Sequence, residues 1–474
     1  MIKNLHKKLI NKEITSEELV QKTILKAEES QKELNAFVTI IKDPEKQESN
    51  NLLAGIPCAI KDNISTKGIL STGSSNTLKD YIPYFDATVI KKLKEAGAVI
   101  VGKTALDELG MGGTGLIAAT GPVKNPWNPN KITGGSSSGS AAAVAAGIVP
   151  YALGTDTGDS IRIPAAHCGI VGYKPTYGMV SRFGIFAFAS SLDTVGVLTT
   201  SVEDAAIVIN QIKGQDDYDM TSWDSKDINL LDSLNGQVKN KKLFYIKEIC
   251  DINNYEDKTN ELVKTVEEFH KTLKKCQELG IEVDEVSIDQ KLLDSIYPTY
   301  LTIASAEATS NMSNLTGIIF GPRGKGNTID EMMKDHRTKG FSSLIKKRFV
   351  IGSYVLQKEN QERYLFASAK VRRLIVNKMN ELFTKYDGMI LPASCEPAPN
   401  VNGVKSIHLR TEQYLAIGNF GGYPSITIPS GFVSDMPIGI NLTGKIKDDA
   451  NILNIAYTLE QKLGYKNQIA KGEK

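Results

Sequence analysis

Residues 134–168 have the sequence GGSSSGSAAAVAAGIVPYALGTDTGDSIRIPAAHC, and the interpretation of the whole chain starts from this segment. Two loops rich in glycine, serine and threonine enclose a block of small apolar residues. Each loop is followed by residues that can form a helix. Glycine lets a backbone come close to a ligand, and hydroxyl groups gather in the same place. We therefore expect a catalytic or binding site at these two loops.

Ser160 is the candidate nucleophile. It closes the second loop, residues 155–160 (TDTGDS), and it precedes residues 161–164, where a helix can begin. The first N–H groups of a helix have no partner inside the helix, so several of them can converge on one anionic oxygen. A serine here can also be a simple helix cap, and a GxS pattern alone favours that interpretation. Catalysis by serine further requires a base and oxyanion donors.

Lys61 is the candidate base. It follows residues 55–60 (GIPCAI), an apolar run that predicts a buried strand. Burial disfavours the charged form of lysine and lowers its pKa, which a lysine base requires. A lysine at a strand end can instead extend its ammonium group to water. Lys61 alone therefore leaves both roles open.

The segment 134–168 resembles the signature of the amidase-signature family of serine hydrolases. The resemblance implies that Ser160 is the acyl-ester nucleophile, that Ser136 is the bridging serine and that Lys61 is the base. It also implies a cis peptide bond between Ser136 and Ser137. His167 lies near Ser160 in sequence, but no orienting carboxylate accompanies it, and the family uses lysine.

The family resemblance also implies the fold. We expect an α/β protein with one large domain over residues 1–474, in which helices cover both faces of a central mixed β-sheet. The signature core spans about residues 55–200, and residues 1–35 form an N-terminal helical segment. From local patterns we expect helices at 15–33, 86–97 with Asp86 as the cap, 141–146, 257–279 and 303–314, and strands at 36–41, 55–60, 98–102, 148–153, 242–246 and 281–288.

Residues 171–196, and more thinly the rest of the chain, resemble one branch of the family, the glutamine-hydrolysing subunits of tRNA-dependent amidotransferases. In that branch an arginine holds the glutamine carboxylate, and we place it at Arg348, with Lys347 as the competing choice. An acidic residue meets the glutamine amino group, and Glu412 stands where an aspartate is usual. Either charge could instead be a solvated surface group. The implied substrate-binding residues are Met111, Gly112, Thr157, Gly158, Asp159, Arg348 and Glu412.

The branch resemblance implies that glutamine is hydrolysed at Ser160 and that the ammonia converts Glu-tRNA(Gln) to Gln-tRNA(Gln), or Asp-tRNA(Asn) to Asn-tRNA(Asn). It implies no metal and no cofactor in this chain. ATP and Mg²⁺ are expected to act through a partner, the B subunit, which also binds most of the mischarged tRNA, and a small C subunit completes a heterotrimer. The alternatives are a stand-alone amidase for another small amide and a catalytically impaired interaction subunit.

Two residues depart from the family's loops. The family normally has glycine where this chain has Ser138 and Asp159. A carboxylate beside an oxyanion site raises the cost of the developing negative charge. This cost is avoided only if the Asp159 side chain points away from the substrate and its backbone N–H alone faces it, and the sequence leaves both cases open.

Composition limits the remaining classes of function. The 474 residues carry 56 basic and 54 acidic side chains, so charge gives no case for this chain binding a nucleic-acid backbone unaided. No GxxxxGK[ST] loop is present, and residues 321–328 (GPRGKGNT) lack its spacing. Five scattered cysteines suggest neither a disulfide framework nor a zinc site. No apolar run approaches the about 18 residues of a membrane span, so we expect a cytoplasmic protein without a membrane partner.

Overall fold

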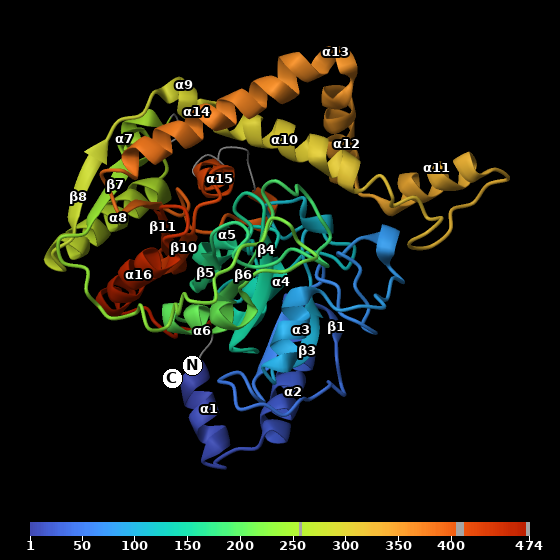
Figure 1. Ribbon diagram of the computed structural model, residues 1–474, viewed down its shortest axis with the longest axis horizontal. Coiled ribbons are helices and arrows are strands. Elements are labelled where there is room, and N and C mark those ends of the chain that lie inside the picture. Colours follow the sequence, from blue (N-terminus) through green and yellow to red (C-terminus); the bar gives the residue numbers. More distant parts are fainter. Residues whose placement is uncertain (256–257, 404–411, 471–474) are drawn as a thin grey trace.

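Eleven strands form one mixed sheet at the centre of the computed structural model, which describes residues 1–255, 258–403 and 412–470 (Figure 1). Their order across the sheet is β1-β3-β2-β4-β6-β5-β10-β11-β9-β7-β8. The expected α/β fold with a central mixed sheet is confirmed. The strands are β1 (Phe37–Ile40), β2 (Pro57–Lys61), β3 (Val99–Thr104), β4 (Tyr151–Asp156), β5 (Val171–Lys174), β6 (Thr194–Thr199), β7 (Lys242–Ile246), β8 (Glu282–Val286), β9 (Gly388–Pro392), β10 (Ser425–Val433) and β11 (Met436–Gly444).

The strands that carry Lys61 and the second serine loop are buried on both faces of the sheet. β2 pairs in parallel with β3 and β4, and β4 pairs antiparallel with β6. Along β2, Cys58 and Ile60 join the core on one face, whereas Ala59 joins the core on the other. A strand covered on both sides has a nearly continuous apolar sequence. This explains why residues 55–60 could be predicted as a buried strand that ends at Lys61.

Two layers of helices cover the faces of the sheet. α2 (Ser16–Leu34), α4 (Ser138–Ala145) and α5 (Arg162–Cys168) pack in one core. α3 (Thr88–Glu95), α6 (Val202–Ile212), α8 (Asn260–Glu278) and α16 (Asp449–Leu463) pack in the other. The alanine-rich α4 presents little side-chain bulk, so its backbone lies close to the sheet.

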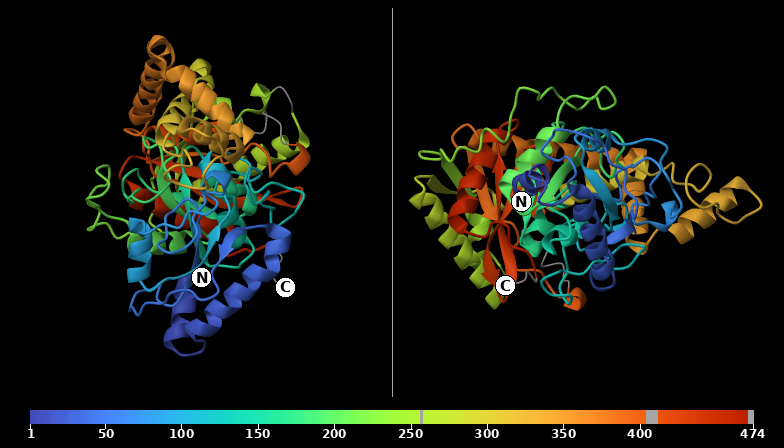
Figure 2. Two further views of the ribbon diagram at one scale, coloured as in Figure 1. Left: turned by 90° about the vertical axis from the view of Figure 1, so that its right-hand side faces the viewer. Right: turned by 90° about the horizontal axis from the view of Figure 1, so that it is seen from below.

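A further helical group lies at the top of Figure 1 and covers the serine loops. α10 (Ile296–Asn311) packs against α12 (Ser343–Leu356), α14 (Ala367–Leu382) and α15 (Glu412–Phe420). α11 (Ile329–Gly340) projects away from the body in Figure 1 and in the right-hand view of Figure 2. The remaining helical elements are α1 (Ile2–Ile10), α7 (Lys247–Cys250), α9 (Gln290–Asp294), α13 (Lys358–Asn360), η1 (Asn76–Leu78), η2 (Glu108–Gly110), η3 (Ile252–Asn254), η4 (Gln361–Phe366) and η5 (Val401–Gly403).

Four local expectations differ from the structure, and one of them is the helix expected at 303–314, which runs from Ile296 to Asn311. Asp86 does not cap α3, because its carboxylate accepts hydrogen bonds from the Lys67 backbone N–H (2.8 Å) and the Lys94 ammonium (3.0 Å). The helix expected at 141–146 starts earlier, at Ser138. The strand expected at 148–153 starts later, because Gly147 adopts a positive φ of 63° and the Ile148 N–H closes α4.

None of the helices in the described part of the chain is both long enough and apolar enough to cross a membrane.

Gly139 marks the closest approach of α4 to its neighbours, and we expect Gly139→Ala to destabilise the protein. A Cβ at this position would lie 2.3 Å from the Ala36 carbonyl oxygen and 2.6 Å from the Ala105 nitrogen, both backbone atoms. Overpacking of this kind costs about 1–3 kcal/mol. The free energy of unfolding in urea is the measurement. Gly431→Ala is the control, because the nearest atom there is 3.6 Å away, and an equal loss in both variants would contradict this account.

Candidate active site

Lys61, the last residue of β2, points its ammonium group into a cluster of oxygens. Its Nζ donates to Ser136 Oγ at 2.7 Å and to Ser137 Oγ at 2.8 Å. It also donates to the Oγ1 (2.9 Å) and the carbonyl oxygen (3.1 Å) of Thr155. The lysine side chain is fully buried. The structure thus brings Lys61 and Ser136 into direct contact, although 75 residues separate them.

Burial sets the protonation state of Lys61. Removal from water lowers the pKa of Lys61 to about 7, and the carboxylates of Asp156 and Asp107 only partly offset this effect. A lysine with such a pKa exchanges its proton near neutral pH, as a lysine acting in proton transfer must.

The two serine loops touch through glycine. Gly135 has a φ of 56°, and a Cβ there would lie 2.4 Å from Pro164 Cδ and 3.2 Å from Ser160 Cα. The Ser137 N–H then donates to the Ser160 carbonyl oxygen (3.1 Å). The expected cis peptide at Ser136 is wrong, because no peptide bond in the described residues is cis. Both hydroxyls reach Lys61 across a trans bond.

A buried ion pair holds the second loop in shape. Arg162 Nη2 lies 2.8 Å from Asp156 Oδ1, and Arg162 Nε donates to Asp156 Oδ2 at 3.1 Å. Asp156 also accepts the Ile161 N–H (2.9 Å), and Arg162 donates to the Gly158 carbonyl oxygen (2.7 Å). Burial works to raise the pKa of Asp156, but Arg162 and these hydrogen bonds outweigh it and lower that pKa. Asp156 therefore stays ionised and fixes the turn that presents Ser160.

The turn leaves backbone donors free around Ser160. Among the described residues, no acceptor takes the backbone N–H groups of Gly158, Asp159 or Ser160. Ser160 itself is only 4% exposed. Unpaired backbone N–H groups beside a nucleophile are suited to stabilise an oxyanion.

Asp159 directs its carboxylate toward Ser160, so the structure shows the case in which the negative charge lies beside the candidate nucleophile. The Ser160 hydroxyl donates to Asp159 Oδ1 at 3.4 Å. The Asp159 carbonyl accepts the N–H groups of Arg162 and Ile163 at the start of α5, which fixes its backbone. Burial, helped by the negative charge of Asp156, raises the pKa of Asp159 to about 7, although Arg162 opposes the shift.

A cavity of about 90 Å³ lies beside this carboxylate. Of the residues expected to bind substrate, four line it. Within the described residues, the buried Nη1 of Arg348 has no hydrogen-bond partner, whereas Lys347 is exposed. The structure therefore places Arg348, and not Lys347, at the cavity. Its lining residues are Gly112, Gly113, Gly158, Asp159, Tyr297, Tyr300, Arg348, Gln413 and Ala416.

Three of the expected substrate-binding residues are not among the lining residues. The Met111 side chain is buried in the hydrophobic core. The Thr157 hydroxyl donates to Asp193 (2.6 Å) and so braces the loop. Glu412 is the first residue of α15, and its side chain lies outside the described part of the structure.

Tyr297, Tyr300 and Gln413 were not anticipated. The Tyr300 ring lies 3.0 Å from where a Cβ would stand on Gly158, so it covers the serine loop closely. Burial raises the pKa of Tyr300 above its usual range. Both tyrosines belong to α10, where the sequence has no motif, and only the three-residue spacing of YPTY hinted that they share a face.

The loop that contains Gly112 is anchored to the serine loops. Asp107 accepts the N–H groups of Thr114 (2.9 Å), Gly115 (3.0 Å) and Ile117 (2.9 Å). The Gly135 N–H donates to the Gly113 carbonyl oxygen at 2.9 Å. Ser138, one of the two departures from the family, packs against Gly115. Three loops from distant parts of the chain are thus joined around Lys61 and Ser160.

The model of the family described as Amidase matches residues 18–453. This chain belongs to the amidase family. A relative from Lactobacillus acidophilus, named as the A subunit of glutamyl-tRNA(Gln) amidotransferase, is 40% identical over 97% of this chain and 96% of its own length. A relative of the same name from Exiguobacterium sibiricum is 37% identical and covers 98% of this chain and 97% of its own length.

Solved structures agree with the family assignment. The crystal structure of the A subunit of glutamyl-tRNA(Gln) amidotransferase from Thermotoga maritima superimposes with a TM-score of 0.81, at 35% identity, over 97% of this chain and 96% of the other. The peptide amidase from Stenotrophomonas maltophilia has a TM-score of 0.82 at 24% identity, over 98% of this chain and 97% of its own. The second comparison shows the shared fold alone.

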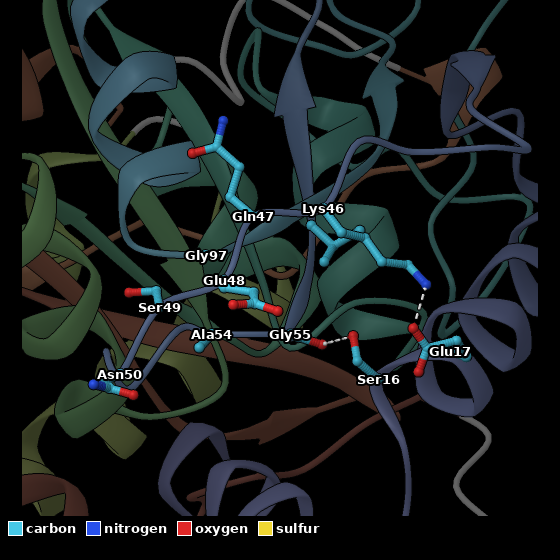
Figure 3. Close-up of a pocket in the computed structure, with 11 residues that line it drawn as sticks. Ser16, Glu17, Lys46, Gln47, Glu48, Ser49, Asn50, Ala54, Gly55 and Gly97 are labelled. Atoms are coloured by element: carbon cyan, nitrogen blue, oxygen red, sulfur yellow. Dashed lines mark hydrogen bonds and ion pairs between the residues drawn. The ribbon is translucent and has the colours of Figure 1, made fainter.

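A larger surface hollow of about 770 Å³ lies elsewhere (Figure 3). It borders Gly55 and Val99, where β2 and β3 begin, whereas Lys61 lies where β2 ends. Ser16 donates to the Gly55 carbonyl oxygen (3.1 Å), and Lys46 pairs with Glu17 (2.8 Å). Because Ser16 and Lys46 each already bind a neighbouring group, the residues that line this hollow place no serine beside an unpaired lysine. Over the ranges that the structure describes, no cluster of His, Cys, Asp and Glu is arranged to hold a metal ion.

The low pKa of Lys61 predicts a pH-dependent stability. Between about pH 7 and 10.5 the unfolded lysine binds a proton that the folded one does not, so stability rises with pH in this window. Between pH 6.5 and pH 9, the free energy of unfolding of the wild type should rise by about 2–3 kcal/mol more than that of Lys61→Met. Urea unfolding at both pH values is the measurement. Lys79→Met, at an exposed lysine, is the control and should show no such difference from the wild type. If the unfolding free energies of the wild type and Lys61→Met differ by the same amount at both pH values, the lowered pKa of Lys61 is refuted.

Proposed function

We propose that this chain is the glutamine-hydrolysing subunit of a tRNA-dependent amidotransferase. The observation that carries the proposal is Arg348, whose buried Nη1 has no hydrogen-bond partner within the described residues and which lines the cavity that also borders Gly158 and Asp159. A guanidinium binds a carboxylate with two parallel hydrogen bonds. The cavity therefore suits an amide whose other end carries a carboxylate, as in glutamine, better than a neutral aliphatic amide.

The cavity is also small. Pockets for drug-sized ligands usually have about 300–1,000 Å³, whereas this one has about 90 Å³. A compact amino-acid amide fits that size better than a peptide amide. The curated relatives at 37–40% identity, each named as the A subunit of glutamyl-tRNA(Gln) amidotransferase, support the same choice.

In the proposed reaction, the Ser160 oxygen attacks the side-chain amide carbon of glutamine. The free N–H groups of Gly158, Asp159 and Ser160 stabilise the oxyanion. Ammonia leaves, and water then releases glutamate from the acyl-enzyme. Lys61 and Ser136, which are hydrogen-bonded at 2.7 Å, supply and accept protons at the reacting groups.

The rest of the assembly belongs to the proposal. Amide formation on tRNA-bound glutamate needs an activated carboxylate, and this chain has no phosphate-binding loop and a net charge of only +2. We assign ATP, Mg²⁺ and most tRNA contacts to the B subunit, and stabilisation of the pair to the C subunit, so that this chain itself holds no cofactor. Glu-tRNA(Gln), Asp-tRNA(Asn) or both are the acceptors. Cys58, Cys168, Cys250 and Cys276 are buried free thiols, in keeping with a reducing cytoplasm.

Ser160→Ala tests the proposed function. With the B and C subunits, ATP and glutamine, the wild type should form Gln-tRNA(Gln) from Glu-tRNA(Gln), and Ser160→Ala should lose glutamine-dependent synthesis at least 1,000-fold. Because the ammonia source alone is removed, added ammonium should restore synthesis. Product tRNA and released glutamate are the readouts. Hydrolysis of simple aliphatic amides but not glutamine would support a stand-alone amidase, and an inactive wild type would support an impaired interaction subunit.

Arg348→Gln and Lys347→Gln form a matched pair. Arg348→Gln should raise the KM for glutamine at least 30-fold, because a charge-assisted bidentate contact of about 2–3 kcal/mol is lost. Lys347→Gln removes an exposed charge and should change the KM less than twofold. Glutamate release at varied glutamine concentration is the measurement. Equal effects of the two substitutions would sink the assignment of the carboxylate to Arg348.

A further inference from the structure

We propose that the Asp159 carboxylate takes the proton from the Ser160 hydroxyl when its oxygen attacks the substrate. This inference rests on the proposed function for the identity of the substrate, but not for the chemistry of Ser160. It concerns one of the two residues at which this chain departs from a glycine of the family.

The first support is the hydrogen bonding of Ser160 itself. Its hydroxyl donates to Asp159 Oδ1 (3.4 Å), and among the described residues no hydrogen bond joins it to Ser136. Ser136 Oγ instead accepts from the Lys61 ammonium at 2.7 Å. Catalytic hydrogen bonds are often long before substrate binds and shorten in the complex. The hydroxyl proton of Ser160 therefore already faces Asp159.

The second support is that Asp159 is the loop carboxylate with capacity to accept a proton. Asp156 is committed to Arg162, to the Ile161 N–H and to Asn419. The one side-chain hydrogen bond of Asp159 within the described residues is the one from Ser160. Asp159 also lines the cavity that contains Arg348, although Ser160 itself is not among the lining residues.

The third support is the electrostatic setting. Burial and Asp156 raise the pKa of Asp159 to about 7, Asp107 adds to the shift, and Arg162 opposes it. Arg348 and Tyr300 face the same cavity. An acid with a pKa raised in this way exchanges its proton near neutral pH and is a stronger base than an ordinary aspartate.

The step balances with Lys61 as the proton source. The Ser160 proton passes to Asp159 as the oxygen–carbon bond forms, and the carbon–nitrogen bond breaks as protonated Lys61 gives a proton through Ser136 to the leaving ammonia. Water then attacks the acyl-enzyme and returns a proton through Ser136 to Lys61. The bond between the acyl carbon and the Ser160 oxygen then breaks, and this oxygen takes back the proton that Asp159 held. Glutamine and water thus yield glutamate and ammonia, and both side chains regain their starting states.

Two substitutions of Asp159 test the proposal. Asp159→Asn keeps the shape of the side chain, and Asp159→Gly restores the family's residue, so at least one of them should fold. The probe is a small alkyl fluorophosphonate, which forms a bond with the serine oxygen and releases fluoride without any protonated leaving amine. Mass spectrometry of the full chain, before and after labelling, locates the adduct, and thermal melting reports folding.

We expect both variants to label Ser160 at least 100-fold more slowly than the wild type, within the range for loss of a general base. The wild-type rate should rise with pH through about 7, and the variants should lack this rise. Ser136→Ala should keep more than a tenth of the labelling rate while losing glutamine hydrolysis, because Ser136 serves the leaving ammonia.

The opposite pattern would overturn the proposal. If Asp159→Asn or Asp159→Gly labels within threefold of the wild type and Ser136→Ala does not label, the proton passes through Ser136. Failure of the proposed function gives a different result. If labelling of the wild type depends on Asp159 but the wild type releases no glutamate from glutamine, even with its partners, then glutamine is not the substrate, and the assignment of Asp159 as the base still holds.

Discussion

The buried pair between Arg162 and Asp156 is the interaction on which the site depends. Neither side chain has any exposed surface. The guanidinium also donates to the Leu415 carbonyl oxygen (2.7 Å) and to Asn419 Oδ1 (2.7 Å), both in α15. Breaking a buried pair by removing one partner costs about 3–5 kcal/mol, because the other charge stays buried. The pair therefore joins the Ser160 turn to a helix more than 250 residues away.

Close backbone approach is the second constraint. Gly135 lets the first serine loop lie against Ser160, and Gly139 lets α4 lie against Ala36 and Ala105. A side chain at Gly135 would push the two serine loops apart, and a side chain at Gly139 would push α4 away from Ala36 and Ala105. The small residues around α4 thus have a geometric role: they place a buried lysine and two loops within hydrogen-bonding distance.

The site also combines charges that burial would normally exclude. The pKa of Lys61 falls to about 7 and that of Asp159 rises to about 7, both chiefly because of burial. An acid and a base with matched pKa values can exchange protons with a substrate at neutral pH without a large energetic penalty. A glycine at 159 would remove the carboxylate that accepts the hydrogen bond of the Ser160 hydroxyl, so the departure from the family changes the proton chemistry open to Ser160.

The sequence by itself determined the α/β fold, the buried strand that ends at Lys61 and the two loops with Ser136 and Ser160, because these follow from local apolar patterns and a contiguous signature. Only the tertiary structure showed that Arg348 rather than Lys347 lines the cavity beside Gly158, since neighbouring residues of α12 point in different directions. The place of Tyr300 and the direction of the Asp159 side chain were also undetermined. Both depend on packing between segments distant in the chain, which no local pattern encodes.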